Sequence, residues 1–337
     1  MRAVVTGGAG FVGSHMVDLL VDRGCDVCVI DNLSTGRLEN LAQHRGNPQV
    51  RIFETDMVGL EMACPRLAGA DYVFHFGGIG DIVPSIERPL DYMRANVTGT
   101  LAVLEAARYA KVRKFVYAAS SSCYGSAPRI PTPEDAPVVP EYPYALSKYL
   151  GECAVMHWGK VYGLPVISLR IFNAYGPRSR TSGVYGAVFG IFLAQKLKSS
   201  PFTVVGDGTQ TRDFVYVTDV ARAFLLAAES THTQEVLNVG AGAPQSVNRL
   251  VELLGGDVVH VPKRPGEPDC TWADTRKIRE RLRWLPEVSF EDGVANMLQS
   301  IEYWSDAPVW TPEAIEAATQ VWFKYLGREH AAEREGA

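Results

Sequence analysis

The chain has 337 residues, of which 47% are hydrophobic and 21% are charged, and its formal net charge is -5. This length can bury a large core, and the composition is that of ordinary globular proteins. The modest negative charge gives no electrostatic reason to expect a nucleic-acid partner. The first residues lack the pattern of a signal peptide, and the longest apolar run, at 183–194, is too short to cross a bilayer. We therefore expect a cytoplasmic protein without a membrane span.

The N-terminal half alternates β-branched runs with stretches of helical length. Strands are expected at 2–8, 26–32, 50–56, 72–78, 114–122 and 164–173, and helices at 11–24, at 91–111 and around Tyr144. Strands that alternate with helices indicate βαβ units, and hence a parallel sheet covered on both faces. The sequence therefore predicts an α/β fold with a doubly wound parallel sheet of the Rossmann type.

After residue 173 the pattern loosens into stretches rich in glycine, proline and arginine, with shorter helices. We interpret 1–172 as the Rossmann domain, with 205–235 returning to it, and 173–310 mainly as a smaller substrate-binding lobe. The remaining segment, 311–337, is interpreted as a C-terminal helix and tail. Thr311 is a typical N-cap and Pro312 a typical first helical residue. One face of this helix is apolar at helical spacing, so we expect it to pack on its own subunit, with a partner interface as the alternative.

Six cysteines are scattered along the chain, and only Cys25 and Cys28 form a CxxC pair. Both lie in a predicted strand, where residues three positions apart point to opposite faces. No second CxxC or histidine pair completes a zinc site. We interpret both cysteines as small apolar strand residues and expect no metal site.

Three glycines, Gly7, Gly10 and Gly13, follow the first predicted strand and open the first predicted helix. Glycines there let the backbone approach a pyrophosphate, whose charge is met by the helix N-terminus. A tight turn that binds no ligand could carry the same glycines. Asp31, however, ends the second predicted strand, 18 residues after Gly13. A carboxylate there can accept hydrogen bonds from the ribose hydroxyls of NAD and would repel the 2′-phosphate of NADP, so the pattern favours NAD.

Tyr144 and Lys148 lie four positions apart in a stretch that begins like a helix. Alone, they could be an ordinary pair of helical neighbours. A predicted strand that ends in Ser120, Ser121 and Ser122 precedes them, which supplies hydroxyl groups where a parallel sheet opens. A phenol with a pKa of about 10 is a poor base at neutral pH, but an adjacent ammonium favours its phenolate. We therefore predict Tyr144 as a general base assisted by Lys148, with a serine holding the reacting hydroxyl.

Together, these features resemble the extended short-chain dehydrogenase/reductase superfamily, specifically its nucleotide-sugar epimerases and dehydratases. The resemblance runs through nearly the whole chain and includes RIFNAYGPR, GDGTQTRDFVYVTDVA and RPGEPDCTWADT, although HFGG at 75–78 replaces the more usual HLAA or HFAG. The cofactor-binding residues that it implies are Gly7, Gly10, Phe11, Val12, Gly13, Asp31, Asn32, Asp56, Met57, Phe76, Gly77, Gly78, Asn96, Tyr144 and Lys148.

The same resemblance implies roles on the substrate side. Ser120, four places before the tyrosine of the family's Tyr-Gly pair, matches the catalytic hydroxyl that acts with Tyr144 and Lys148. The neighbouring Ser121 and Ser122 would face the sugar. Residues at positions that hold the nucleotide diphosphate in relatives are Asn173, Arg212 and Arg264.

The residues around Ser120 distinguish the family's reactions. Sugar 4,6-dehydratases resemble one another in a Thr-Asp-Glu run there, because expelling water needs an additional acid and base. UDP-glucuronate decarboxylases carry a glutamate at the third place, where this chain has Ser122. GDP-sugar 3,5-epimerases and the reductase that makes GDP-fucose carry a cysteine at that place, whereas Cys123 of this chain lies one position later. The reaction that remains is 4-epimerisation through a transient 4-keto sugar, with NAD regenerated in each turnover.

The sugar itself is indicated by one residue. In UDP-hexose 4-epimerases, the residue before the aromatic of the WAD-like motif controls the room for an N-acetyl group, and here it is the small Thr271. The resemblance therefore implies UDP-GlcNAc and UDP-GalNAc as substrates, alone or alongside UDP-glucose and UDP-galactose. A UDP-glucuronate 4-epimerase, or another nucleotide-sugar dehydratase or reductase, is the alternative.

A non-catalytic NAD-binding protein is a third reading, which predicts loss of Tyr144, Lys148 or Ser120, yet all three are present. Family members commonly dimerise through the helices that correspond to about 90–110 and 144–162. We therefore expect a homodimer.

Overall fold

The computed structural model describes residues 1–179, 188–263 and 267–327, and a seven-stranded parallel sheet lies at its centre. The strand order is β11-β6-β5-β4-β1-β2-β3, which reverses direction between β1 and β4. Open parallel sheets bind ligands beyond the carboxyl ends of the strands at such a point. The predicted Rossmann-type sheet is therefore confirmed. Its strands are β1 (Arg2–Thr6), β2 (Asp26–Asp31), β3 (Val50–Glu54), β4 (Tyr72–His75), β5 (Lys114–Ser120), β6 (Val166–Ile171) and β11 (Glu235–Val239).

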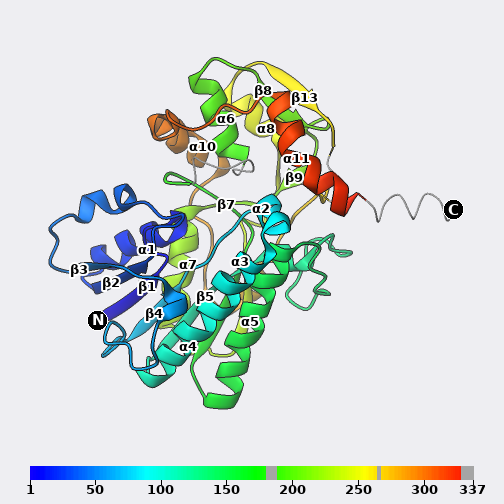
Figure 1. The fold of residues 1–337 in the computed structure, drawn as a ribbon. Helices are drawn as coiled ribbons and strands as arrows, with labels where there is room; N and C mark the ends of the chain where they lie inside the picture. The colour runs from blue at the N-terminus through cyan, green and yellow to red at the C-terminus, as the bar shows by residue number, and fades with distance from the viewer. Residues whose placement is uncertain (180–187, 264–266, 328–337) are drawn as a thin grey trace.

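Helices cover both faces of this sheet (Figure 1). On one face, α1 (Phe11–Asp22), α7 (Val217–Glu229) and α9 (Arg276–Leu282) pack over an apolar cluster with alternate strand residues. On the other face, α4 (Gly99–Tyr109) and α5 (Pro143–Tyr162) cover a second cluster. Because the strands are buried on both faces, their sequences are nearly continuous apolar runs.

The helix predicted over 91–111 consists of three consecutive segments: α3 (Pro89–Met93), one π-helical turn η3 (Arg94–Thr98), and α4. Asn96 lies in the π-turn. Its side-chain oxygen accepts from the Ile79 amide at 2.8 Å, and its nitrogen donates to the Ile79 carbonyl at 3.0 Å and to Ser147 Oγ at 2.8 Å. Turns of this kind are frequent at functional sites. Here the turn ties the loop after β4 to α5.

A smaller lobe, drawn above the main sheet in Figure 1, surrounds an apolar cluster that includes Phe189, Phe202, Leu250 and Trp304. It contains α6 (Val188–Leu197), β8 (Phe202–Val205), α8 (Val247–Leu254), β13 (Val258–Val261), α10 (Phe290–Gln299) and η5 (Ile301–Trp304). Two short strand pairs, β7 (Asn173–Tyr175) with β10 (Phe214–Tyr216) and β9 (Thr211–Arg212) with β12 (Gln245–Ser246), lie outside the main sheet. Parts of the chain beyond the expected 205–235 segment also return to the main sheet. The strand β11 is one of its seven strands, and α9 and Trp284 pack on it.

The C-terminal helix α11 (Pro312–Leu326) begins at the N-cap Thr311, whose hydroxyl accepts from the Ala314 amide at 3.3 Å. Its apolar face is buried at Ile315, Thr319 and Trp322. This face packs within the same chain, where α11 lies against the short helix α2 (Ile82–Glu87) (Figure 1).

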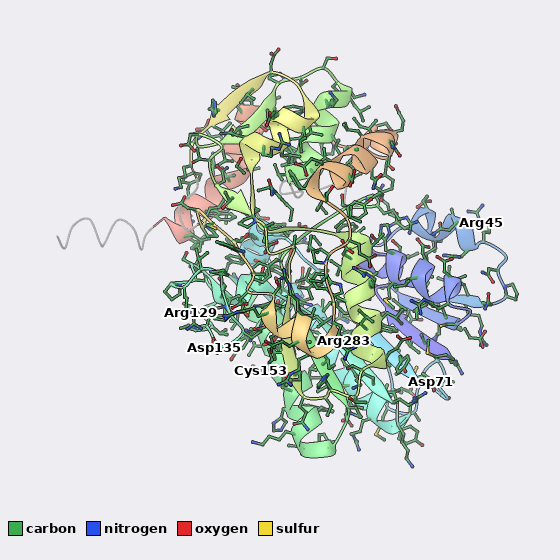
Figure 2. All side chains as sticks on the ribbon, turned by 180° about the vertical axis from the view of Figure 1, so that it is seen from behind. Arg45, Asp71, Arg129, Asp135, Cys153 and Arg283 are labelled. Atoms are coloured by element: carbon green, nitrogen blue, oxygen red, sulfur yellow. The ribbon has the colours of Figure 1, made fainter. Side chains whose placement is uncertain are left out.

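The cysteines of the CxxC pair lie on opposite faces of the sheet, with Cys25 in one apolar cluster and Cys28 in the other. Cys153, by contrast, is exposed on α5 (Figure 2). Among the residues that the structure describes, no cluster of three or more metal-ligating side chains occurs, and none of their helices is both long and apolar enough to span a bilayer.

Candidate active site

A cavity of about 550 Å³ opens at the carboxyl ends of the central strands. It is lined by all but one of the residues predicted to bind the cofactor; the exception is Asn96, which is buried behind the loop after β4. Sequence reasoning missed several other lining residues, because most are small or apolar and have no signal that separates them from core residues. They are Ile30, Ser34, Thr35, Thr55, Ile79, Gly80, Ala95, Ala118, Ala119, Ile171, Phe172 and Ala174.

The glycine turn joins β1 to α1 at one end of this cavity. Gly7 has a φ of +68°, and a Cβ on it would lie 2.7 Å from the Gly77 nitrogen. A Cβ on Gly13 would lie 2.1 Å from the Gly7 carbonyl oxygen. Side chains at these two positions would therefore both clash with the backbone and fill the approach to the helix.

The N-terminus of α1 opens on the cavity beside Gly10 and Phe11. Its N-cap, Gly10, provides no side-chain hydrogen bond, and the first turn of α1 contains no acidic residue. The first amide groups of a helix have no partner within it, and they carry partial positive charge. An anionic group such as a pyrophosphate fits this end of the cavity.

Asp31 lies at the end of β2, where its carboxylate is held by the backbone. One oxygen accepts from the Ala9 amide at 2.9 Å and the other from the Leu33 amide at 2.8 Å. Burial raises the pKa of Asp31, and these two hydrogen bonds oppose the rise. Each oxygen still has acceptor capacity, so the carboxylate can receive the hydroxyls of a ribose. The chemistry of this end of the cavity therefore fits NAD.

The first glycine of HFGG, Gly77, has a local explanation. A Cβ on Gly77 would lie 2.6 Å from the Met57 sulfur and 3.1 Å from Thr6 Oγ1. The Gly77 amide also donates to Thr6 Oγ1 at 3.2 Å. The thioether of Met57 thus occupies the space that an alanine methyl would need.

Ser120, Tyr144 and Lys148 meet at the other end of the cavity. Ser120 ends β5, while Tyr144 and Lys148 lie in the first two turns of α5. Ser120 Oγ lies 2.8 Å from Ser122 Oγ and is hydrogen-bonded to Tyr144. Lys148 is buried, with its Nζ 4.6 Å from the centroid of the Tyr117 ring.

The electrostatics of Tyr144 differ from the expectation that Lys148 would favour its phenolate. Burial raises the pKa of Tyr144, the hydrogen bond with Ser120 lowers it, and the charge of Asp81 raises it further. Burial also lowers the pKa of Lys148 to about 8, against the opposing effect of Glu152. Desolvation is therefore the largest influence on Tyr144 in the protein alone, and it holds the pKa of this phenol above its usual value. A further positive charge in the cavity would favour its ionisation.

A second cavity, of about 670 Å³, adjoins the first and shares Ser120, Tyr144 and Asn173 with it. The predicted sugar-side residues Ser121, Ser122, Arg212 and Thr271 line it as well. The remaining predicted residue, Arg264, lies outside the described residues. The structure thus brings together residues from β5, β7, β9 and the segment before α9.

Two of the predicted substrate residues already have protein partners. Thr271 Oγ1 donates to Asn173 Oδ1 at 2.8 Å and accepts from the Asp213 amide at 3.2 Å. Arg212 is largely buried, and its Nη2 lies 2.8 Å from Glu267 Oε1. A diphosphate that binds Arg212 must therefore share this guanidinium with a carboxylate, which the five donors of arginine permit.

Sequence reasoning missed several residues of the second cavity. They come from segments distant in the sequence: Arg37, Asn40, Gly80, Asp81, Ile82, Glu141, Tyr142, Arg178, Tyr303, Ile315 and Trp322. Asp81 has a φ of 132°, which is rare for a residue other than glycine and costs conformational energy. This strained backbone was a signal that only the structure could provide.

Comparisons with known proteins agree with this geometry. The sequence model of the NAD dependent epimerase/dehydratase family matches residues 3–240. The chain is 35% identical over 303 residues to a putative UDP-glucose 4-epimerase of Methanocaldococcus jannaschii. This match covers 88% of this chain and 96% of that protein. Its fold is similar to that of two solved enzymes. The UDP-N-acetylglucosamine 4-epimerase of Methanobrevibacter ruminantium, in complex with UDP-N-acetylmuramic acid, has a TM-score of 0.85 at 32% identity, over 89% of this chain and 98% of that one. The UDP-glucuronic acid 4-epimerase of Bacillus cereus, with UDP-glucuronic acid and NAD, has a TM-score of 0.83 at 30% identity, over 90% and 99%.

Proposed function

Because the chain belongs to the NAD-dependent epimerase/dehydratase family, we propose that it is a 4-epimerase of a UDP-hexose. NAD is the cofactor of this family. The proposal is carried by the serines at the end of β5: Ser120 is hydrogen-bonded to Tyr144, and Ser121 and Ser122 line the adjoining cavity. No carboxylate stands at this place in the sequence, where the family's dehydratases have one.

The residues of this chain divide the proton chemistry among them. Tyr144 takes the proton of the sugar 4-hydroxyl and returns it after the sugar has turned, while Ser120 holds that hydroxyl in a hydrogen bond. Lys148 supplies a buried positive charge at the wall of the same cavity. NAD bound in the first cavity would supply the hydride acceptor and donor, and the positive charge of its oxidised nicotinamide would favour ionisation of Tyr144.

We expect the smaller lobe to bind the nucleoside diphosphate part of the substrate. Arg212 suits a diphosphate because its planar guanidinium can pair with two oxygens at once. It lies at the junction of the 670 Å³ cavity with a further cavity of about 380 Å³, which is lined by residues within 205–212, by Lys263 and by residues 267–269. Holding the diphosphate here leaves the sugar free to rotate beside Tyr144.

The first experiment is to incubate the purified protein with UDP-GlcNAc, without added NAD, and to follow the products by proton NMR. Appearance of UDP-GalNAc would support a 4-epimerase with retained NAD. If UDP-GlcNAc is not converted, with or without added NAD, the N-acetyl substrate is excluded and UDP-glucose and UDP-glucuronate are tested in the same way.

A dehydratase with relocated acid and base groups is the second candidate, because two carboxylates besides Glu267, which pairs with Arg212, reach the sugar cavity from other segments. These are Asp81, before α2, and Glu141, whose Oε1 accepts from the Ser126 amide at 2.8 Å. A 4-keto-6-deoxy product in the NMR experiment would favour this candidate and contradict the epimerase.

Thr271 provides a test of the N-acetyl substrate. Replacing Thr271 with tyrosine should fill the cavity beside Asn173, so we expect activity on UDP-GlcNAc to fall at least about tenfold more than activity on UDP-glucose. The matched control is Thr271→Val, which removes the hydrogen bond to Asn173 without adding bulk. Equal losses on both substrates in the tyrosine variant would show that this residue does not select the sugar.

We also propose that the protein is a homodimer formed by α4 and α5, which pack side by side. These helices expose several large apolar side chains, which water disfavours and a second copy could cover. They are Tyr109, Leu146, Leu150, Val161 and Tyr162. Light scattering should therefore give twice the chain mass, and Leu150→Glu should shift it toward one chain mass; a monomeric native protein would contradict the proposal.

A further inference from the structure

The apolar face of α11 is buried, yet it does not extend an apolar core. Ile315 and Trp322 are only 6% and 3% exposed, but neither belongs to any of the four apolar clusters formed by the described residues. Both side chains instead line the 670 Å³ cavity that contains Ser120 and Tyr144. The burial of this helix face therefore closes the substrate cavity.

Trp322 is linked to the catalytic end by one intervening ring. Its ring centroid lies 6.4 Å from that of Tyr142, and the Tyr142 ring is stacked on Tyr144 at 6.4 Å with an interplanar angle of 11°. Tyr142 is the N-cap residue of α5 and is also hydrogen-bonded to Ser122. The indole thus belongs to the same packed group as the residues proposed to hold the sugar.

The start of α11 is fixed to the smaller lobe. The fully buried Gln195 of α6 donates from Nε2 to the Trp310 carbonyl at 2.7 Å and to Thr203 Oγ1 at 2.9 Å. The N-cap Thr311 follows directly. A buried amide that satisfies both groups holds the chain where it enters α11, so the position of Trp322 is specified by hydrogen bonds as well as by packing.

We propose that Trp322 is a specificity-determining residue, which with Ile315 forms an apolar wall of the sugar pocket and favours a sugar that carries an N-acetyl group. This inference rests on the proposed function. A methyl group that leaves water for such a wall gains hydrophobic free energy, whereas a hydroxyl placed there loses its hydrogen bonds to water. A sugar carboxylate would lose still more.

The test compares Trp322→Ala with Phe323→Ala, a matched control because Phe323 is the next residue of the same helix and is 41% exposed. For each protein, kcat/KM is measured with UDP-GlcNAc and with UDP-glucose. We expect Trp322→Ala to lower the ratio of the two values about tenfold, mainly through KM for UDP-GlcNAc. Phe323→Ala should leave the ratio unchanged.

An unchanged ratio in Trp322→Ala, whether both activities persist or both fall equally, would overturn the inference. If Trp322→Ala does not fold, Ile315→Ser gives the same comparison from the other side of the wall. If the native protein converts neither substrate, calorimetric titration with both UDP-sugars gives the ratio of affinities without turnover. A native preference for UDP-GlcNAc that Trp322→Ala removes would then support this inference although the proposed reaction had failed, and the absence of any such preference would contradict it.

Discussion

Replacement of Tyr144 by phenylalanine should lower the rate of 4-epimerisation by about a hundredfold to ten-thousandfold, the usual contribution of a positioned general acid or base. The substitution removes one oxygen atom and leaves the ring, so the stacking with Tyr142 is retained. Ser120 loses its hydrogen bond to the phenol but keeps the one to Ser122. The loss should therefore appear in kcat, with little change in the affinity for the UDP-sugar.

The control is Tyr162→Phe, which makes the same chemical change on the same helix at a residue 51% exposed and far from the cavity. Both variants should retain NAD, which is measured after acid release. A rate for Tyr144→Phe within a few-fold of the native rate would exclude Tyr144 as the base. Loss of NAD from this variant alone would instead show that the phenol is needed to hold the cofactor.

The parts of the site that sequence reasoning located best are those built from neighbouring residues. A strand followed by Gly7, Gly10 and Gly13 is typical of a tight turn into a helix, because a side chain at Gly13 would clash with the Gly7 carbonyl. Tyr144 and Lys148 share a helix face because they are four residues apart. In both cases the local geometry follows directly from the spacing.

The parts that it missed depend on contacts between distant segments. The hydrogen bond from Thr271 to Asn173 spans 98 positions, and Trp322 reaches Tyr142 from the far end of the chain. An apolar helix face predicts burial, but it does not indicate whether a core or a cavity is covered. Asn96 shows the same limit, because its hydrogen bonds to Ile79 and Ser147 are not indicated by its position in the sequence.

The direction of the pKa shift of Tyr144 was also beyond the reach of the sequence. The spacing to Lys148 suggested a lowered pKa, because it indicates only that a positive charge is near. The depth of burial, which raises the pKa, depends on the packing of α5 against the sheet. Spacing therefore predicted which two residues act together, while the extent of desolvation required the fold.

The second large effect is expected at the buried ion pair between Arg170 on β6 and Glu152 on α5. Arg170 Nη2 donates to Glu152 Oε1 at 2.6 Å, Nε donates to both carboxylate oxygens, and the two side chains are only 6% and 4% exposed. Ser168 donates to the same carboxylate at 2.8 Å. This pair ties the sheet to the helix that carries Tyr144 and Lys148.

Arg170→Met should therefore destabilise the protein by about 3 to 5 kcal/mol, because it leaves the Glu152 carboxylate buried with only Ser168 as its partner. The free energy of unfolding is measured in urea by circular dichroism. The control is Arg129→Met, which breaks the pair with Asp135 at the edge of the molecule (Figure 2), where the side chains are 61% and 79% exposed. An exposed pair of this kind contributes at most about 1 kcal/mol. A loss for Arg170→Met no larger than that of the control would contradict the expectation.

A third variant separates the two causes of such a loss. Adding Glu152→Leu to Arg170→Met removes the unpaired charge as well, and buried pairs replaced by apolar residues of similar size are often neutral in stability. The double variant should therefore regain most of the stability lost in Arg170→Met.

Because Glu152 raises the pKa of Lys148, its removal should also lower that pKa below its value of about 8. Lys148 would then lose its charge at a lower pH, so the fall in activity on the alkaline side should begin earlier in the double variant than in the native protein.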